Sequence, residues 1–342
     1  MLTTRYATSS HVRAGITLLS AATFLCAIAS VATAQESTSL VVTLLGTGRP
    51  DPVIDRFGPS TLVEAGGERL LFDAGRGASQ RLWQLKVPLG QLNALFLTHL
   101  HSDHTVGIPD LWLTGWLPTP YGRRAAPLEV WGPAGTRGMI AGLRTAYAWD
   151  LRVRAQQEGL PVAGAELVAH EIHEGVVFNR HGVRVTAFLV DHGGLLKPAF
   201  GYRVDYAGHS VVVSGDTRYS QNLIKFAAGT DLLVHEVAAT DPDLLTHSPT
   251  APVARRILGW HSSPEDAAHV FQQVHPKLAV FTHVVLLTTD AAFAPPPLAT
   301  VLARATAIYS GPLVVGEDLM SFVVGDSVRV RPRAVPASAS TP

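Results

Sequence analysis

Residues 95–104 read Leu-Phe-Leu-Thr-His-Leu-His-Ser-Asp-His, an apolar run that ends in three histidines and one aspartate. The apolar half is typical of a buried strand. His99 and His101 are two residues apart, so a strand end points both side chains the same way, and the following turn can bring Asp103 and His104 to a neighbouring centre. Because imidazole and carboxylate groups are common metal ligands, this stretch predicts a metal site at the end of a strand.

The run from Thr98 to His104 resembles the signature of the metallo-β-lactamase superfamily. Other segments resemble that family in the same order along the chain: Leu45–Gly48, Phe72–Gly75, Asp191-His192, Ser214–Thr217 and Phe281–His283. The resemblance covers most of the chain after residue 34. It implies an α/β fold, namely a four-layer αβ/βα sandwich with two mixed β-sheets, formed as one hydrolase domain over residues 35–330.

The resemblance also implies two adjacent metal ions held by seven side chains. His99, His101 and His192 would hold one ion, Asp103, His104 and His283 the other, and Asp216 would bridge them. Nitrogen and oxygen donors without sulfur favour two Zn²⁺, with Mn²⁺ or Fe as substitutes. Two such ions make a metal-bridging hydroxide available at neutral pH, which predicts hydrolysis. A non-catalytic metal-binding protein is the alternative, and it is disfavoured because every ligand position holds a competent residue.

Two further segments, Val234–Val237 and Trp260–Ser263, resemble the ribonuclease Z-like branch of this superfamily. The resemblance implies that His261 faces the leaving group and that Glu236 holds it through a hydrogen bond. We therefore place His261 and Glu236 with Asp103 in the catalytic set. An exposed histidine ahead of a helix is the alternative interpretation of His261.

The first 34 residues read as a cleaved secretory signal peptide. Arg5 and Arg13 are the only charges before Glu36, and an uncharged stretch over residues 14–34 ends in Ala-Thr-Ala ahead of Gln35. This predicts a periplasmic or secreted protein with no membrane contact after cleavage; an uncleaved anchor is the alternative. The sole cysteine, Cys26, would leave with the signal, which excludes thiol catalysis. The Pro/Ala/Ser-rich residues 331–342 predict a disordered tail.

Beyond the motifs, the sequence predicts a helix over Pro264–Val274, because Ser263 can cap it and Pro264 suits its first position. Strands are expected over Asp231–Val234 and Leu278–Thr282, ending just before the polar motif residues. The residues from Ala238 to Trp260 show no recognisable pattern.

The substrate is predicted from motif details and charge. A bridging Asp216 disfavours a dedicated β-lactamase, and Arg56–Ser60 and Lys197–Tyr202 resemble arylsulfatase-type members of the branch. We therefore predict an exported hydrolase of a small phosphodiester or sulfate ester. Amide or lactone hydrolysis, including β-lactam opening as a minor activity, is one alternative, with an apolar pocket walled by Trp112, Trp116 and the Pro-rich loop Ala294–Pro297. A ribonuclease Z-type phosphodiesterase is the other.

Nucleic acid is not expected as a partner. The chain carries 27 Lys and Arg against 27 Asp and Glu, so it has no global basic field, and it lacks a Lys/Gly-rich arm for gripping tRNA. Four arginines, at positions 123, 124, 137 and 144, could form one basic patch, but solvated surface charge is the usual reason for such residues. The predicted partner is a small-molecule ester, and a homodimer is left open.

Overall fold

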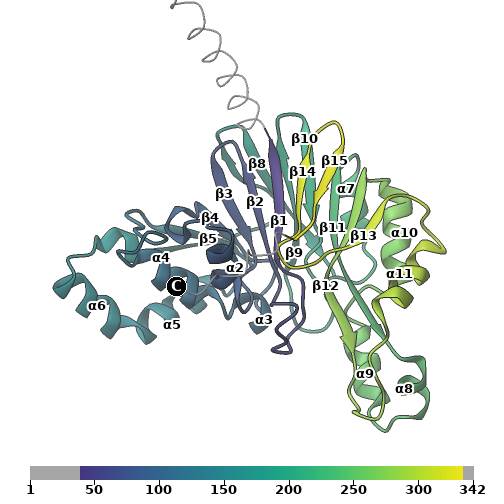
Figure 1. Cartoon of the computed structure of the whole chain (residues 1–342). Coiled ribbons are helices and arrows are strands. Elements are labelled where there is room, and N and C mark those ends of the chain that lie inside the picture. The colour runs from purple at the N-terminus through teal and green to yellow at the C-terminus, as the bar shows by residue number, and fades with distance from the viewer. Residues whose placement is uncertain (1–38, 334–342) are drawn as a thin grey trace, which may run out of the picture. The chain divides into compact units, whose positions relative to one another are not determined.

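The computed structural model describes residues 39–333, so the predicted signal peptide and most of the predicted tail lie outside the described residues. Two mixed β-sheets pack face to face, and helices cover their outer faces (Figure 1). This arrangement confirms the predicted α/β sandwich. Within residues 39–333, no helix combines the length and the apolar character needed to cross a membrane.

The eight-stranded sheet has the order β15-β14-β1-β2-β3-β4-β5-β6 and the seven-stranded sheet the order β13-β12-β11-β10-β9-β8-β7. The first sheet comprises β1 (Leu40–Gly46), β2 (Ser60–Ala65), β3 (Glu68–Phe72), β4 (Ala94–Phe96), β5 (Leu128–Gly132), β6 (Leu167–Glu171), β14 (Ser321–Val324) and β15 (Val328–Arg331). The second comprises β7 (Gly175–Arg180), β8 (Val183–Val190), β9 (Ala199–Tyr206), β10 (His209–Val213), β11 (Leu232–Thr240), β12 (Leu278–Leu287) and β13 (Leu313–Val315).

The helices form two outer layers. Those that follow strands of the first sheet are α2 (Ala78–Gln84), α3 (Ser102–Thr105), α4 (Ile108–Trp116), α5 (Thr136–Ala146) and α6 (Ala148–Gln157). Those of the second sheet are α7 (Gln221–Ala227), α10 (Pro264–Val274) and α11 (Leu298–Thr306). Helices α8 (Pro242–His247) and α9 (Ala251–Leu258) instead project away from the sandwich (Figure 1).

The packing of strand β4 explains why its sequence is apolar throughout. Phe96 lies in the cluster between the two sheets, whereas Leu95 faces the other way, into the cluster beneath α4. A strand with both faces covered has no solvent side, so it reads as a continuous apolar run instead of an alternation. The polar residues that follow therefore begin at the edge of the sheet, where the apolar layers end.

Strands β11 and β12 run past the points where the sequence predicts their ends. They pair in parallel from Leu232 with Leu278 to Thr240 with Leu287, and the register shifts after Glu236, which leaves His283 as an extra residue on β12. The expected ends at Val234 and Thr282 were wrong because apolar residues beyond the motifs continue the pairing. The unpatterned stretch after Ala238 contains the rest of β11 and helices α8 and α9.

Helix α10 begins as predicted. The Ser263 side chain accepts a hydrogen bond from the Asp266 backbone, and the Asp266 carboxylate accepts one from the Ser263 backbone, with Pro264 at the first position. This capping box fixes the direction in which the chain enters the helix. It thereby positions His261, two residues ahead of the cap.

Candidate metal centre

All seven predicted ligands lie at one edge of the sandwich. His99 follows β4, and the single turn α3 carries Asp103 and His104 back toward it. His192 follows β8, Asp216 follows β10, and His283 occupies the bulge in β12. The backbone of His283 is left-handed, with φ of 40°. A bulge re-aims a side chain, and here the extra residue is a histidine that faces the other ligands.

The first group contains three histidines. His101 Nδ1 lies 3.1 Å from His99 Nε2 and 3.2 Å from His192 Nε2. Asp216 Oδ2 lies 3.8 Å from His99 Nε2 and 3.7 Å from His192 Nε2.

The second group contains two histidines and a carboxylate. His283 Nε2 lies 3.1 Å from His104 Nε2 and 3.3 Å from Asp103 Oδ2. Asp216 Oδ2 again completes the group, at 3.4 Å from His104 Nε2 and 3.3 Å from His283 Nε2. One oxygen of Asp216 is therefore shared between the two groups.

These donor sets fit divalent metal ions. Tetrahedral bonds of about 2.0–2.1 Å place neighbouring donor atoms about 3.3–3.4 Å apart, close to the spacings in both groups. The other carboxylate oxygen of Asp216 is buried and has no hydrogen-bond partner among residues 39–333. A buried carboxylate with an unpaired oxygen is costly unless a cation compensates it. The residues present thus fit two adjacent ions with Asp216 between them.

Outer hydrogen bonds fix which nitrogen of each histidine faces inward. His104 donates from Nδ1 to Asp73, 2.8 Å away, and His192 donates from Nδ1 to the carbonyl of Trp260. His99 Nδ1 contacts the Thr98 hydroxyl, which itself donates to Asp73. With Nδ1 engaged, each of these three rings directs Nε2 at the other donor atoms, and Nε2 is therefore the nitrogen through which each would bind a metal ion.

Asp73 holds this part of the site together. Its carboxylate accepts hydrogen bonds from the backbone and hydroxyl of Thr98 and from His104. Its backbone is left-handed, with φ of 59°, a conformation that a non-glycine residue keeps only where its surroundings enforce it. Asp73 is thus a positioning residue beside the cluster.

The carboxylates of the cluster are strongly held in their charged form. Burial raises the pKa of Asp103, but the hydrogen bond from His283 and the charge of His104 more than offset this and lower it to about 2. Burial also opposes the charge of Asp216, whose pKa is nevertheless held well below its ordinary value by His283, His104 and His99. Charged carboxylates are the form that binds cations.

His261 and Glu236 lie on one flank of the cluster. His261 Nδ1 is 3.0 Å from Glu236 Oε2 and 3.9 Å from Asp216 Oδ2. Glu236 is fully buried, and its other oxygen accepts hydrogen bonds from the backbones of Thr217 and Ser262. Burial lowers the pKa of His261, but the charge and hydrogen bond of Glu236 and the charge of Asp216 raise it to about 9. The Glu236 carboxylate therefore favours the protonated form of His261.

A buried ion pair supports the site and has no signal in the sequence. Asp318 accepts hydrogen bonds from Thr47 and Phe57 and pairs with Arg81 at 2.8 Å. The carbonyl of Thr47 in turn accepts from the backbone of Val284, next to His283. The pair thus links the loop after β1 to the bulge in β12.

Two of the sequence-based assignments near the site were wrong. Trp112 and Trp116 are fully buried, and their indole N–H groups donate to the carbonyls of Ala165 and Pro161, so they belong to the core and do not wall a pocket. Arg124 is also buried, with its guanidinium on the carbonyls of Trp112, Leu111 and Leu89, so it is not part of a surface patch.

Comparisons with known proteins place the chain in a family. Residues 68–284 match the family described as "Beta-lactamase superfamily domain". The chain is 37% identical over 291 residues to "Ribonuclease Z" of Mycobacterium sp. (strain KMS), covering 85% of this chain and 98% of that protein. It is 38% identical over 244 residues to "Ribonuclease Z" of Mycobacterium marinum, covering 71% of this chain and 86% of that protein.

Solved structures show the same fold. The metallo-β-lactamase fold protein YhfI from Bacillus subtilis matches with a TM-score of 0.63 at 16% identity, covering 84% of this chain and all of that one. The short form of human tRNase Z matches with a TM-score of 0.58 at 24% identity, covering 82% of this chain and 98% of that one.

The prediction about partners was wrong. The Mycobacterium relatives named "Ribonuclease Z" match over most of their length, which contradicts the expectation that the partner is a small-molecule ester and that nucleic acid is not involved. The error has a physical reason: net charge sums the whole surface, whereas contact with nucleic acid depends on the local field of one face.

The seven donor side chains at one edge, the fold and the sequence relatives all point to the same family. The chain belongs to the metallo-β-lactamase superfamily, as a ribonuclease Z-like hydrolase.

Proposed function

We propose that this protein is a dinuclear metal-dependent phosphodiesterase that cleaves RNA. The observation that carries the proposal is the convergence of seven donor side chains into two groups that share one oxygen of Asp216. Two adjacent cations suit a phosphodiester because they can bind both the attacking and the leaving side of the phosphorus centre. The full-length relatives named Ribonuclease Z support RNA as the source of that phosphodiester.

The ions are proposed to be Zn²⁺. The donors comprise five imidazoles and two carboxylates with no thiolate, a set that suits Zn²⁺ first and tolerates Mn²⁺ or Fe. When bound, two such ions lower the pKa of water to near neutrality and neutralise charge on the phosphate oxygens.

The side chains of this protein supply the proton for the leaving group. A sugar oxygen is a poor leaving group, so it needs a proton as its bond to phosphorus breaks. His261 carries that proton, and because its Nδ1 is engaged by Glu236, its Nε2 remains for the substrate. Glu236 is itself fixed by two backbone N–H groups, so the imidazole is held in one orientation.

We also propose that the enzyme is exported. The charge and apolarity pattern of residues 1–34 supports a signal peptide, which would expose the enzyme to RNA outside the cytoplasm. Intact-mass analysis of the exported protein should give Gln35 as the first residue. A mass that retains Met1 in a membrane fraction would contradict cleavage.

The function is tested with the purified protein and two substrates. One is an end-labelled stem-loop RNA with a 3′ extension, of which a precursor tRNA is one example; the other is bis(p-nitrophenyl) phosphate, which reports on the metal centre alone. We expect both to be hydrolysed and Asp216→Ala to abolish both. Hydrolysis of the nitrophenyl ester without any RNA cleavage would refute RNA as the substrate while leaving the hydrolase assignment intact.

A further inference from the structure

Helices α5 and α6 form a pair that hardly contributes to the core. Among residues 136–157, only Thr136 and Ile140 are buried, and α6 has no buried residue. Apolar side chains on the inner face, including Met139, Leu143 and Leu151, pack partly against the cluster beneath α4. The outer face is left without a partner in the described part of the chain, and it stands at one side of the sandwich (Figure 1).

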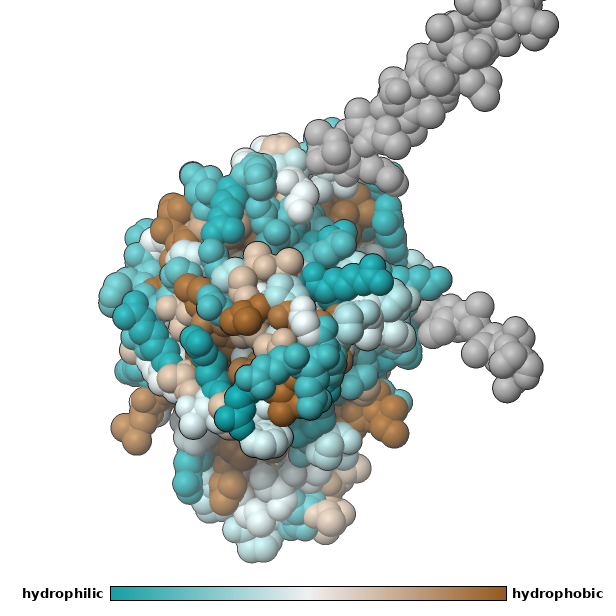
Figure 2. Space-filling model, turned by 90° about the vertical axis from the view of Figure 1, so that its left-hand side faces the viewer, coloured by the Kyte–Doolittle hydropathy of each residue, from teal (hydrophilic) through white to brown (hydrophobic). Residues whose placement is uncertain are grey.

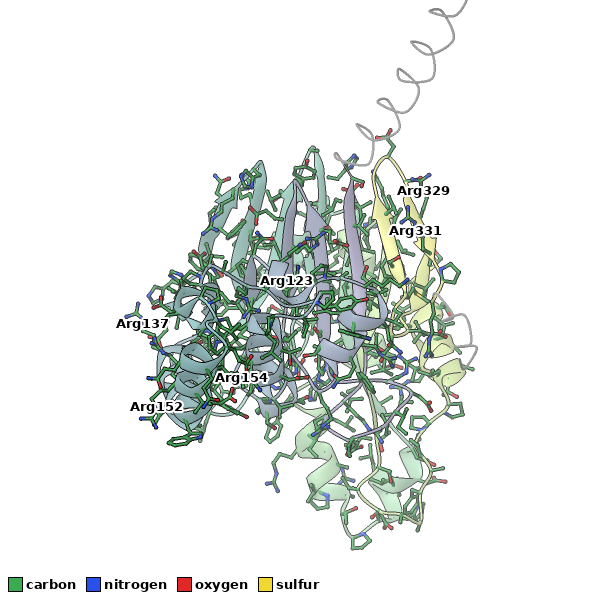
Figure 3. The ribbon with its side chains drawn as sticks, turned by 60° about the vertical axis from the view of Figure 1, so that its left-hand side comes forward. Arg123, Arg137, Arg152, Arg154, Arg329 and Arg331 are labelled. Atoms are coloured by element: carbon green, nitrogen blue, oxygen red, sulfur yellow. The ribbon has the colours of Figure 1, made fainter. Side chains whose placement is uncertain are left out.

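The outer face carries positive charge. Arg137 and Arg144 are seven residues apart on α5 and therefore share a face, and both are exposed, as is Arg152 on α6. Arg154 is paired with Asp150 and Glu158, whereas no ion pair within residues 39–333 involves Arg137, Arg144 or Arg152. Figure 3 shows Arg137 and Arg152 projecting outward from this helix pair. Three uncompensated guanidinium groups thus gather on one surface.

The same face carries an exposed aromatic ring. Trp149 is 71% exposed, although tryptophan is usually buried, and the guanidinium of Arg152 lies 4.7 Å from its ring centre. Figure 2 shows this side of the molecule with hydrophobic residues interspersed among hydrophilic ones. Such interspersion is unlike the continuous apolar patch of a protein or membrane interface. An open indole beside arginines instead suits a base stacked on the ring and phosphates around it.

The helix pair is connected to the metal centre. Strand β5, which leads into α5, runs parallel to β4, which leads into His99. Gly135, just ahead of α5, lies close to Leu100, which is between the ligands His99 and His101. A Cβ atom added at Gly135 would lie 3.0 Å from Leu100 Cδ1. A polymer bound along α5 can therefore continue toward the metal-ligand side chains.

We propose that the outer face of α5 and α6, defined by Arg137, Arg144, Trp149 and Arg152, is a docking surface for the RNA substrate away from the cleaved bond. This inference rests on the proposed function. The arginines bind phosphates of a structured region, and Trp149 stacks on an unpaired base. It explains how a chain with zero net charge grips a polyanion, because three arginines without an ion pair among residues 39–333 lie on one face.

The test compares two double variants that remove equal charge. Arg137→Gln with Arg152→Gln alters the docking surface, and Arg329→Gln with Arg331→Gln alters exposed arginines on β15, at the opposite edge of the same sheet (Figure 3). Binding of a fluorescein-labelled stem-loop RNA to the full-length protein is measured by anisotropy at several salt concentrations. The first variant should bind about tenfold more weakly and lower the slope of log K against log salt by about 1.4–1.8, the value for two lost phosphate contacts. The β15 variant should bind like the native protein.

The variant Trp149→Ala provides an independent test of the docking surface. Loss of one stacked base weakens binding by about five- to 150-fold, with little change in the salt slope. All variants should hydrolyse bis(p-nitrophenyl) phosphate at the native rate, which shows that the fold and the metal centre are intact. If the β15 variant loses as much RNA affinity as the α5–α6 variant, the docking surface is overturned, because any exposed arginine would then contribute equally to binding.

Further outcomes separate this inference from the proposed function. If the native protein cleaves RNA and the α5–α6 variants bind it unchanged, the docking surface is wrong and the function stands. If the native protein neither binds nor cleaves RNA, both fail together. If the variants change the sedimentation mass and leave RNA binding unchanged, the surface is a contact between copies of the chain, and the inference is also overturned.

Discussion

Replacing Glu236 by glutamine removes the negative charge beside His261 and keeps the shape of the side chain. In the native protein burial lowers the pKa of His261, and the charge and hydrogen bond of Glu236, helped by Asp216, raise it to about 9. Without the charge of Glu236 the effect of burial is opposed only by the charge of Asp216. We therefore expect the pKa of His261 to fall from about 9 toward its ordinary value of 6.5.

The size of the effect follows from the protonated fraction of His261. A general acid acts only when protonated, so activity is present below its pKa and is lost as the pH rises through it. At pH 8 a histidine with a pKa of about 9 is about 90% protonated, and one with a pKa of 6.5 is about 3% protonated. Glu236→Gln should therefore cleave RNA up to about 30-fold more slowly at pH 8, and the deficit should shrink as the pH falls.

The assay is the initial rate of RNA cleavage across the pH range, with metal content measured on the same samples. Bis(p-nitrophenyl) phosphate serves as the control substrate, because nitrophenolate leaves without a proton and should show little change. His261→Ala is the matched variant, and it should lower RNA cleavage by about 10²–10⁴-fold with both metal ions retained. Two results would refute the role of His261 as the acid. One is that RNA cleavage by Glu236→Gln falls at the same alkaline pH as in the native protein, and the other is that the variant loses equal activity on both substrates.

Three further predictions concern the metal centre and its support. Treatment with a chelator should abolish hydrolysis and lower the Tm in scanning fluorimetry, since ions that bind only the folded state stabilise it; an unchanged Tm would count against resident ions. Asp73→Asn should weaken metal affinity by about 10–100-fold in competition with a chromogenic chelator, because His104 loses the acceptor that orients it, while the circular dichroism spectrum stays native. Arg81→Met leaves the buried carboxylate of Asp318 without its cation and should lower the free energy of unfolding in urea by about 3–5 kcal/mol. In the matched variant Arg69→Met, loss of the partly exposed pair Arg69–Glu64 should lower it by less than about 1 kcal/mol.

The sequence motifs, through their resemblance to the metallo-β-lactamase superfamily, were enough to predict the fold and to name side chains that meet at one edge. An apolar run that ends in His99, His101, Asp103 and His104 encodes both a buried strand and a ligand set within ten residues. The capped helix at Pro264 was predicted for the same reason, since its signals lie within one turn. Net charge, by contrast, carried no information about where charge lies, and the expectation that nucleic acid is not a partner was therefore wrong.

Other features of the site depend on residues that are far apart in the sequence. Arg81 and Asp318 are separated by 237 positions, and nothing near either residue indicates that they pair in a buried site. The bulge that turns His283 toward the cluster arises from the register between β11 and β12. The outward face of α5 and α6 was likewise visible only once Arg124 proved to be buried and Arg137 exposed. Burial and register are set by what each segment packs against, and a sequence read along its length records only the neighbours that are close in the chain.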